Sequence, residues 1–204
     1  MKPLFIETIR IAKGKAQLTD YHQKRLDRTQ ETFYKTKSIK LLDIIPNTNS
    51  TEDMKCRILY SDKLEDVELV KYSKHNIKEL VIVNANDISY EYKSADRQAF
   101  DKMTRSLENH QLPIIVKNGF ITDTPISNII VRIDNKLITP ANPLLKGVQR
   151  QYLIDTCSVV ETPVPTSILQ HAEEIILINC MMPIDNAIRL PATAIKCTKK
   201  DLLL

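Results

Sequence analysis

Glycine is scarce in this chain, which has only Gly14, Gly119 and Gly147 among its 204 residues. At the average usage of about 7%, a chain of this length would have roughly fourteen. Glycines so far apart cannot form the GxGxxG or GxxxxGK[ST] loops that cradle nucleotide phosphates, and collagen-like repeats and Gly/Ser linkers are excluded as well. We therefore expect the remaining glycines where the backbone geometry requires them.

Long apolar runs are also missing, because no stretch approaches the ~20 residues that a membrane helix needs. The N-terminal segment MKPLFIETIRIAKGK lacks the apolar core and the small-residue cleavage site of a signal peptide. The four cysteines, Cys56, Cys157, Cys180 and Cys197, lie far apart and form no CxxC pair, which argues against a disulfide framework and a zinc ribbon. We expect a cytoplasmic protein with free thiols, no metal ion and no membrane contact.

The charge balance excludes a further class of partner. The chain has 29 Lys+Arg and 25 Asp+Glu, for a formal net charge of +4 at pH 7. This excess is weak evidence for an anionic ligand, but it is not the lysine-rich pattern of a nucleic-acid-binding protein. With 43% hydrophobic residues, the chain can bury the core of one domain or of two small ones. We therefore expect a small-molecule partner and no nucleic acid.

The first half of the sequence predicts a small α/β region. Alternating apolar residues predict strands over 4–11, 56–61, 67–72 and 80–83. A turn at Lys13-Gly14 follows the first strand, and a helix is expected from Thr19 or Asp20 to about Lys37. The polar connector at residues 84–87 suggests a boundary between domains at 1–86 and 87–204.

The second half predicts a mixture of short strands and helices. Ser94 is expected to cap a helix in which Phe100, Met103 and Leu107 share one face. A further helix at 148–156 and a short one at 166–171 separate the strands expected at 113–117, 120–122, 127–133, 136–139, 157–162, 174–179 and 193–197. Because strands and helices do not alternate strictly, the pattern favours an α+β fold over a Rossmann-type sheet.

Five positions have ordinary explanations when each is considered alone. Arg25 belongs to an HxxR pair that would normally be a solvated basic helix face, and Lys93 would normally be a surface lysine. Asp123 and Gly147 would be turn residues, although a helix that follows a glycine can also bind an anion. Cys180 after an apolar strand would be a small hydrophobic side chain.

The order of these positions changes that interpretation. A strand FIETIRI is followed by HxxRL, a mid-chain lysine, GFITDTPISNIIVRIDNKLITP (119–140), LLKGVQRQYLI (144–154) and INCMMP (178–183). This series resembles the class IV aminotransferases, enzymes of fold type IV that depend on pyridoxal 5′-phosphate (PLP). The family includes branched-chain and D-amino-acid aminotransferases and 4-amino-4-deoxychorismate lyases. The similar segments extend from Leu4 to about Ile188.

The resemblance implies a two-domain α+β fold of type IV, in which a small N-terminal α/β domain precedes a barrel-like C-terminal α/β domain that binds PLP. It also implies a homodimer that acts on an amino-acid-like small molecule. Typical members have a further strand and short helix before the position of Leu4, so the resemblance implies a shortened N-terminus.

The resemblance also implies roles at the ring of the cofactor. Lys93 matches the catalytic Schiff-base lysine, which holds PLP and moves a proton. Asp123 stands where the family usually has a glutamate that faces the pyridine nitrogen and keeps it protonated. Aspartate is one methylene shorter, so the strength of that contact is open.

Phosphate binding is implied for two segments. Arg25 matches the arginine that binds the cofactor phosphate, for which the paired donors of a guanidinium are suited. Val148 and Gln149, directly after Gly147, match the positions whose backbone N–H groups complete the phosphate site.

Substrate contacts are implied less directly. Asn179, Cys180 and Met181 match the loop that closes over the substrate carboxylate and the phosphate side. Three residues on the N-terminal strands are candidates to face the substrate, namely Glu7, Arg10 and Arg57. Because Glu7 and Arg10 lie at an odd spacing on one strand, at most one of them can line the pocket.

The reaction remains open at this point. The stretch Ile178–Pro183 looks more like the N-x-x-M-P of aminodeoxychorismate lyases than the S-G-T-A of branched-chain aminotransferases. This favours a lyase that releases pyruvate and forms 4-aminobenzoate for folate biosynthesis. A branched-chain-like aminotransferase is the alternative, and a non-catalytic homologue or basic binding module is a lesser one.

Overall fold

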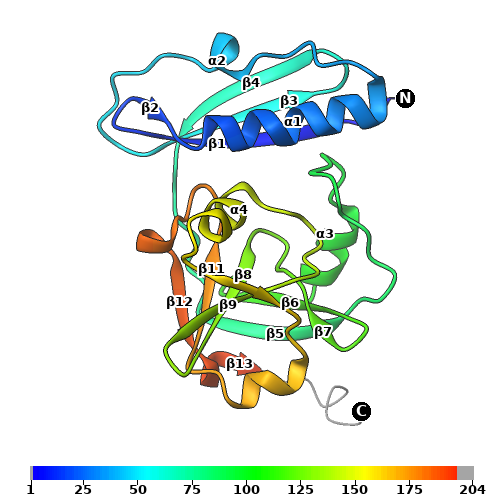
Figure 1. Cartoon of the computed structure of the whole chain (residues 1–204), viewed down its shortest axis with the longest axis vertical. Helices are drawn as coiled ribbons and strands as arrows, with labels where there is room; N and C mark the ends of the chain where they lie inside the picture. The colour runs from blue at the N-terminus through cyan, green and yellow to red at the C-terminus, as the bar shows by residue number, and fades with distance from the viewer. Residues whose placement is uncertain (1, 197–204) are drawn as a thin grey trace. The chain divides into compact units, whose positions relative to one another are not determined.

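The computed structural model describes residues 2–196, which form two compact units (Figure 1). Unit 1 comprises the residues up to 74 together with 92–96, and unit 2 comprises 75–91 and the residues from 97 onward. The single boundary expected between 86 and 87 is therefore wrong. It fails because β5 (Glu79–Asn84) pairs in parallel with β6 (Gln111–Lys117) in a sheet of unit 2, while the chain returns to unit 1 afterwards.

Unit 1 is an antiparallel sheet of four strands in the order β2-β1-β3-β4, with helix α1 packed against it (Figure 1). Its elements are β1 (Phe5–Ala12), β2 (Lys15–Ala16), α1 (Thr19–Tyr34), α2 (Leu41–Ile44), β3 (Met54–Tyr60) and β4 (Leu64–Lys71). The predicted strands and the long helix are confirmed. The short helix α2 falls in a segment whose prolines and polar residues predicted no regular structure.

The core of unit 1 follows from alternation along β1. Phe5, Ile9 and Ile11 are all buried and pack with Leu26 of α1 in one cluster. Burying each such side chain stabilises the fold by about 1.5–3 kcal/mol. Since side chains alternate between the two faces of a strand, Glu7 shares the buried face with these apolar residues.

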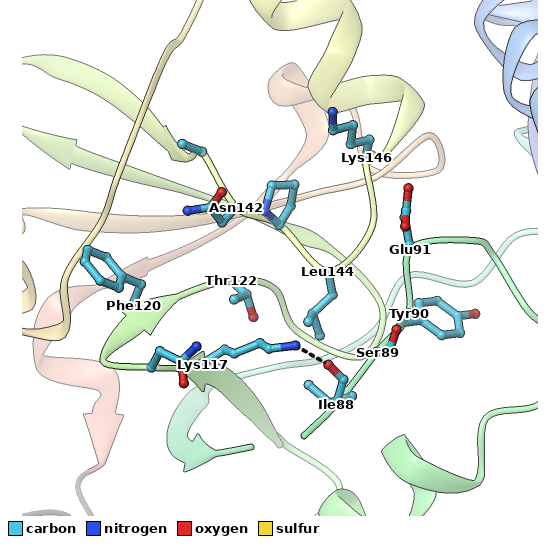
Figure 2. A pocket seen from close by; sticks show the side chains of 13 residues that line it. Ile88, Ser89, Tyr90, Glu91, Lys117, Phe120, Thr122, Asn142, Leu144 and Lys146 are labelled. Carbon is cyan, nitrogen blue, oxygen red and sulfur yellow. Dashed lines mark hydrogen bonds between the residues drawn. The ribbon is translucent and has the colours of Figure 1, made fainter. Parts of the chain in front are cut away.

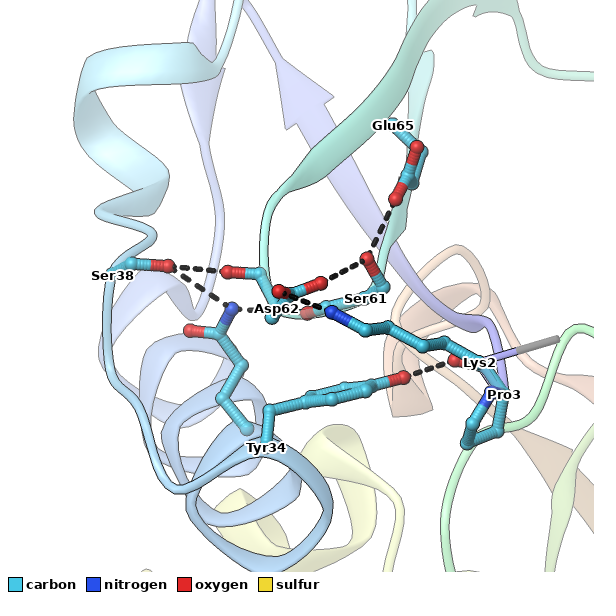
Figure 3. Close-up of polar contacts among 8 residues, drawn as sticks. Lys2, Pro3, Tyr34, Ser38, Ser61, Asp62 and Glu65 are labelled. Atoms are coloured by element: carbon cyan, nitrogen blue, oxygen red, sulfur yellow. Dashed lines mark hydrogen bonds and ion pairs between the residues drawn. The ribbon is translucent and has the colours of Figure 1, made fainter.

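Contacts near the end of α1 tie it to the β3–β4 turn and to the chain start (Figure 3). Lys2 forms an ion pair with Asp62 at 2.6 Å, and Ser38 Oγ donates to the Asp62 carbonyl at 2.7 Å. The Tyr34 hydroxyl donates to the Pro3 carbonyl. The ion pair is largely exposed and screened by solvent, so the apolar core is the main support of the helix.

Unit 2 has a five-stranded sheet in the order β10-β9-β8-β11-β12 and a four-stranded sheet in the order β13-β5-β6-β7. Besides β5 and β6, its elements are α3 (Gln98–Thr104), β7 (Phe120–Ile121), β8 (Asn128–Ile133), β9 (Lys136–Pro140), α4 (Val148–Asp155), β10 (Val160–Thr162), η1 (Thr166–Gln170), β11 (Glu174–Ile178), η2 (Ile184–Asn186), β12 (Ile188–Pro191), η3 (Ala192–Ala194) and β13 (Ile195–Lys196). Parallel and antiparallel pairs are mixed, as the predicted α+β class implies.

Tight turns are evident in the backbone conformation, and the one predicted at Lys13-Gly14 is confirmed. Positive φ angles occur at Lys13-Gly14 (50° and 73°), at Asn118-Gly119 (52° and 80°) and at Asp134-Asn135 (47° and 59°). Each pair joins two antiparallel strands, which is the arrangement that two-residue hairpin turns favour.

Ser94 does not cap a helix, contrary to the prediction. Helix α3 begins at Gln98, its N-cap is Arg97, and no side chain caps it. Ser94 Oγ instead accepts a hydrogen bond from the backbone N–H of Asp96 at 3.1 Å, in a local turn. Phe100 and Met103 lie in α3 as predicted, but Leu107 lies beyond its end, and Ser94 forms a β-bridge with Phe5 instead of starting the helix.

Two further expectations concern the ends and the cysteines. The last predicted strand appears as β13, and Cys197 lies outside the described residues. Cys56, Cys157 and Cys180 are free thiols. Among the helices of residues 2–196, none is long and apolar enough to cross a membrane.

Candidate active site

Lys93 lies on an extended segment of unit 1 that pairs with β1. The backbone N–H of Ile6 donates to the Lys93 carbonyl at 2.9 Å, and the N–H of Ala95 donates to the Leu4 carbonyl at 2.8 Å. The neighbouring Ser94 forms a bridge with Phe5. The lysine backbone is thus fixed to the strand that also carries Glu7.

An aromatic contact strengthens the attachment of this segment to α1. The Tyr92 ring meets the Phe33 ring edge-on, with centroids 4.9 Å apart, and the Arg28 guanidinium stacks over Tyr92 at 4.9 Å. Such a cation–π contact is worth about 0.5–2 kcal/mol. The residue directly before Lys93 is therefore held by the helix that carries Arg25.

Arg25 forms a two-pronged ion pair with Glu7. Its Nε donates to Glu7 Oε1 at 2.9 Å and its Nη2 donates to Oε2 at 2.6 Å. His22, one turn earlier on α1, shares the same Oε2 through Nδ1 at 2.5 Å. The side chains of Glu7 and His22 are fully buried, and that of Arg25 is 13% exposed.

The charge on Glu7 is set by these partners. Burial alone raises the pKa of Glu7, but Arg25 and His22 outweigh it and lower the pKa from 4.5 to about 2. The carboxylate is fully enclosed and both of its oxygens accept hydrogen bonds from helix α1. The expectation that Glu7 faces a substrate is therefore wrong, because its register on β1 directs it into the core.

Arg10 and Arg57 lie on the opposite face of the same sheet, as the strand alternation predicted for Arg10. Arg10 is bound to Asp53 through two hydrogen bonds of 2.9 and 3.1 Å. Arg57 is half-buried and pairs in register with Thr8. Within residues 2–196 its guanidinium makes no hydrogen bond or ion pair, so Arg57 is the better placed of the two for an anionic ligand.

In unit 2, Asp123 is buried among neutral donors and is 4% exposed. Asn128 Nδ2 donates to Oδ1 at 2.7 Å, and the Leu145 N–H donates to Oδ2 at 2.9 Å. Burial raises the pKa of Asp123 from 3.8 to about 6, because these bonds and the more distant Arg150 only partly compensate for lost hydration. A cationic group placed beside Asp123 would therefore stabilise its ionised form and lower its pKa.

Gly147 is required by close packing and not by its φ angle, which is −67°. A Cβ at this position would lie 1.9 Å from Oδ1 of Asn128. The same Asn128 side chain donates to the Leu145 carbonyl at 2.8 Å. Asn128 therefore connects Asp123 to the loop that leads into α4.

Helix α4 begins at Val148 without a side-chain cap. The first N–H groups of a helix have no partner within it, and they carry the positive end of the helix dipole. Val148 and Gln149 are the first two residues of α4, and each is 5% exposed. This helix start has the donors that an anion needs, and the phosphate contact expected here stays a prediction.

The loop after β11 is braced by its own asparagine. Asn179 Oδ1 accepts hydrogen bonds from the N–H groups of Met181 (2.8 Å) and Met182 (2.9 Å), and its Nδ2 donates to the Ile126 carbonyl at 2.9 Å. Met181 is buried at 3% exposure. The Asn179 side chain therefore supports the loop, and the substrate contacts expected of Asn179 and Met181 stay predictions. Cys180 is half-buried between them.

These groups match the chemistry of PLP. Lys93 supplies an amine and Arg25 a guanidinium, both within unit 1. Unit 2 supplies an uncapped helix start and the buried carboxylate of Asp123, whose raised pKa suits a pyridinium partner. Among the described residues, no group of His, Cys, Asp and Glu side chains is arranged to hold a metal ion.

A cavity of about 620 Å³ in unit 2 lies outside the predicted set (Figure 2). It is lined by residues 88–91, by the β6–β7 region and by the loop 141–146. Lys117 closes part of its floor by donating to the Ile88 carbonyl at 2.7 Å. Thr122 and Leu144 in its wall directly precede Asp123 and Leu145. The same two chain segments therefore line the cavity and hold the Asp123 carboxylate.

Two residues of the site were missed from the sequence, namely His22 as a partner of Glu7 and Asn128 as a partner of Asp123. A signal existed for the first, because Glu7 is the one acid in the buried register of the first strand. A buried acid needs a partner, and the HxxR helix supplied one. Asn128 stands at the start of an apolar strand, where a buried polar side chain also needs a partner, so it could have been predicted to bind Asp123.

Residues 4–186 match the family described as amino-transferase class IV. An uncharacterized protein of Haemophilus influenzae is 30% identical over 186 residues, which cover 89% of this chain and 98% of that protein.

Solved structures show the same fold. A Haemophilus somnus protein named as a candidate 4-amino-4-deoxychorismate lyase is 29% identical with a TM-score of 0.82, over 90% of this chain and 98% of the other. A hypothetical aminotransferase from Mycobacterium tuberculosis in a PLP-bound form is 15% identical with a TM-score of 0.71, over 98% and 85%. The chain has the α+β fold of type IV, it is a PLP-dependent enzyme, and it belongs to the class IV aminotransferase family.

Proposed function

We propose that this enzyme is a 4-amino-4-deoxychorismate lyase, which releases pyruvate and forms 4-aminobenzoate. The main support is the similarity to the Haemophilus somnus protein, at 29% identity over 98% of that chain. The N-x-x-M-P sequence of the Asn179 loop points in the same direction. The family as a whole acts on amino-acid-like small molecules, and the lyase substrate carries the required amine.

Each end of the cofactor has residues suited to it. We propose that Lys93 binds PLP through its amine and that Arg25 binds the phosphate. For the N–H groups of Val148 and Gln149 after Gly147 we propose phosphate binding as well, as the family resemblance implies. When bound, PLP withdraws electrons from the amine-bearing carbon of the substrate.

Asp123 serves the ring end in this proposal. Its carboxylate accepts only neutral donors, so a pyridinium N–H beside it would lower the cost of ionisation. The shorter side chain is compensated by rigidity, because Asn128 and Leu145 each bind one carboxylate oxygen. A fixed carboxylate keeps the ring nitrogen protonated.

Lys93 acts as the base and acid. Once the substrate amine has replaced Lys93 on the cofactor, the freed lysine amine would take the proton from the amine-bearing carbon, and the bond between the ring carbon and the enolpyruvyl oxygen would break. The ring becomes aromatic as 4-aminobenzoate, and the released enolpyruvate takes up a proton to give pyruvate. The backbone hydrogen bond between Ile6 and Lys93 fixes the position of the lysine backbone on the strand.

The substrate carries two carboxylates, and we propose Arg57 as the residue that binds one of them. It is half-buried on the sheet face that faces away from α1. Arg10 lies on the same face, but Asp53 already neutralises it. Cys180 remains a candidate contact of the cofactor in the loop that Asn179 braces.

The wider setting is part of the proposal. The family resemblance supports a homodimer, and the free thiols support a cytoplasmic location. The product would enter folate biosynthesis.

The experiment is to supply the PLP-loaded protein with aminodeoxychorismate and to measure pyruvate with lactate dehydrogenase. Pyruvate and 4-aminobenzoate should form in equal amounts, and Lys93→Ala should reduce the rate by about 10³-fold or more. If no pyruvate forms while amino acids convert the bound cofactor to its amine form, the enzyme is an aminotransferase. A protein that does not bind PLP at all would be a non-catalytic homologue.

A further inference from the structure

We propose, on the basis of the function proposed above, that Glu7 and His22 are positioning residues that hold the Arg25 guanidinium in place for the cofactor phosphate. Neither touches the cofactor in this view. They act through Arg25, which alone of the three has an exposed fraction above zero, at 13%.

The geometry of the pair is specific. A guanidinium has five N–H donors in one plane, and a carboxylate that binds Nε and one Nη fixes both the direction and the rotation of that plane. Glu7 makes these two contacts at 2.9 and 2.6 Å, which engage one edge of the guanidinium. The donors on its other edge then have a defined direction before any ligand binds.

His22 fixes the carboxylate in turn. Its Nδ1 donates to Glu7 Oε2 at 2.5 Å, the same oxygen that binds Nη2 of Arg25. Because His22 and Arg25 lie three residues apart on α1, they meet Glu7 from one helix face. The cluster is therefore a chain of three groups, each of which limits the rotation of the next.

Preorganisation explains why a charge pair is placed in the core. Replacing a buried ion pair by apolar residues is often neutral or stabilising, so stability alone does not account for it. A long arginine side chain loses substantial rotamer freedom when it is fixed for a ligand. Here that freedom is already lost when the protein folds, which leaves less to lose when phosphate binds.

A competing effect has the opposite sign. The negative charge of Glu7 lies next to Arg25 and reduces the attraction of the guanidinium for a phosphate dianion. If that effect dominated, Glu7→Gln would bind PLP more tightly. The positioning role predicts weaker binding, so the direction of the change separates the two.

The test compares PLP with pyridoxal, which lacks the phosphate, by absorbance titration of the apoprotein. For Glu7→Gln we expect PLP to bind about tenfold more weakly and pyridoxal to change by less than about twofold. His22→Leu should weaken PLP by a smaller factor. His22→Asn should restore affinity, because its amide nitrogen can replace Nδ1. A merely structural role would weaken both ligands equally.

The matched control is Glu174→Gln, a carboxylate in unit 2 that also accepts from two arginines, Arg132 at 3.2 Å and Arg189 at 2.9 Å. It should leave the ratio of the two affinities unchanged. If Glu7 acts only through Arg25, the double variant Arg25→Lys/Glu7→Gln should prefer PLP to pyridoxal about as much as Arg25→Lys alone. If Glu7→Gln does not fold, as judged by circular dichroism, the two His22 variants decide the question.

The possible failures are distinct. A wild type that prefers PLP to pyridoxal, with the preference unchanged or increased in Glu7→Gln and His22→Leu, overturns the positioning role alone. A wild type without that preference overturns the phosphate role proposed for Arg25 and the positioning role with it.

Discussion

Two buried carboxylates, one in each unit, titrate in opposite directions. Glu7 of unit 1 is fully buried, and its pKa is lowered to about 2. Asp123 of unit 2 is 4% exposed, and its pKa is raised to about 6. Burial disfavours the charged form of both, so burial does not explain the difference.

The difference lies in the partners. Glu7 binds the charged guanidinium of Arg25 and the ring of His22, and these outweigh the loss of hydration. Asp123 binds the neutral donors of Asn128 and Leu145, which do not outweigh its loss of hydration. A carboxylate paired within the protein is a structural anion, whereas one held by neutral groups still favours a cation. The second kind suits the ring nitrogen of the cofactor.

The largest effect is expected for Glu7→Gln on the stability of the apoprotein. Removing one partner of a buried ion pair leaves the other uncompensated, which costs about 3–5 kcal/mol. Urea unfolding should show this loss. The control Glu174→Gln, whose side chain is 24% exposed, should cost less than about 1 kcal/mol. Equal losses would mean that the partners of Glu7 do not matter.

The next effect is a pair of pH dependences with opposite slopes. The lowered pKa of Glu7 gives stability that is fully present above about pH 4.5 and is lost as the pH falls to about 2. The raised pKa of Asp123 gives stability that is present below about pH 3.8 and is lost as the pH rises to about 6. Each amounts to about 3 kcal/mol.

Unfolding free energies of the wild type and of two variants check these slopes. Asp123→Asn should gain stability relative to the wild type as the pH rises from about 4 to 6. The deficit of Glu7→Gln should shrink only below about pH 4.5. If the two variants change over the same pH range, the contrast between the carboxylates is wrong.

A smaller effect is expected at the support of Asp123. Gly147→Ala places a Cβ 1.9 Å from Asn128 Oδ1, and Asn128 is held by bonds to Asp123 and Leu145. Overpacking of this kind costs about 1–3 kcal/mol. Adding Asn128→Ala should relieve part of it. Additive losses in the double variant, measured by thermal unfolding, would contradict this contact.

Much of the fold could be predicted from local patterns. Alternation predicted the strands of unit 1, and Lys13-Gly14 forms the predicted turn with positive φ angles. The single domain boundary failed because strand pairing is not local. The register of β5 against β6 joins residues about 32 positions apart, and no sequence pattern encoded it.

The candidate site was predicted unevenly for the same reason. Lys93, Asp123 and Gly147 were predicted from their order along the chain, and their roles stay predictions. The role of Glu7 was misjudged, because its partners are set by packing. Alternation does place Glu7 in the buried register, but only the structure shows that α1 brings Arg25 to it.

The central claim is that Glu7 serves the phosphate end of PLP through Arg25, while Asp123 serves the ring nitrogen. The direct measurement is the affinity of the wild type, Glu7→Gln and Asp123→Asn for PLP, for pyridoxal and for a PLP analogue with carbon at the ring-nitrogen position. The account predicts that Glu7→Gln loses only the preference for phosphate and that Asp123→Asn loses only the preference for ring nitrogen. Equal losses for all three ligands in both variants would contradict it.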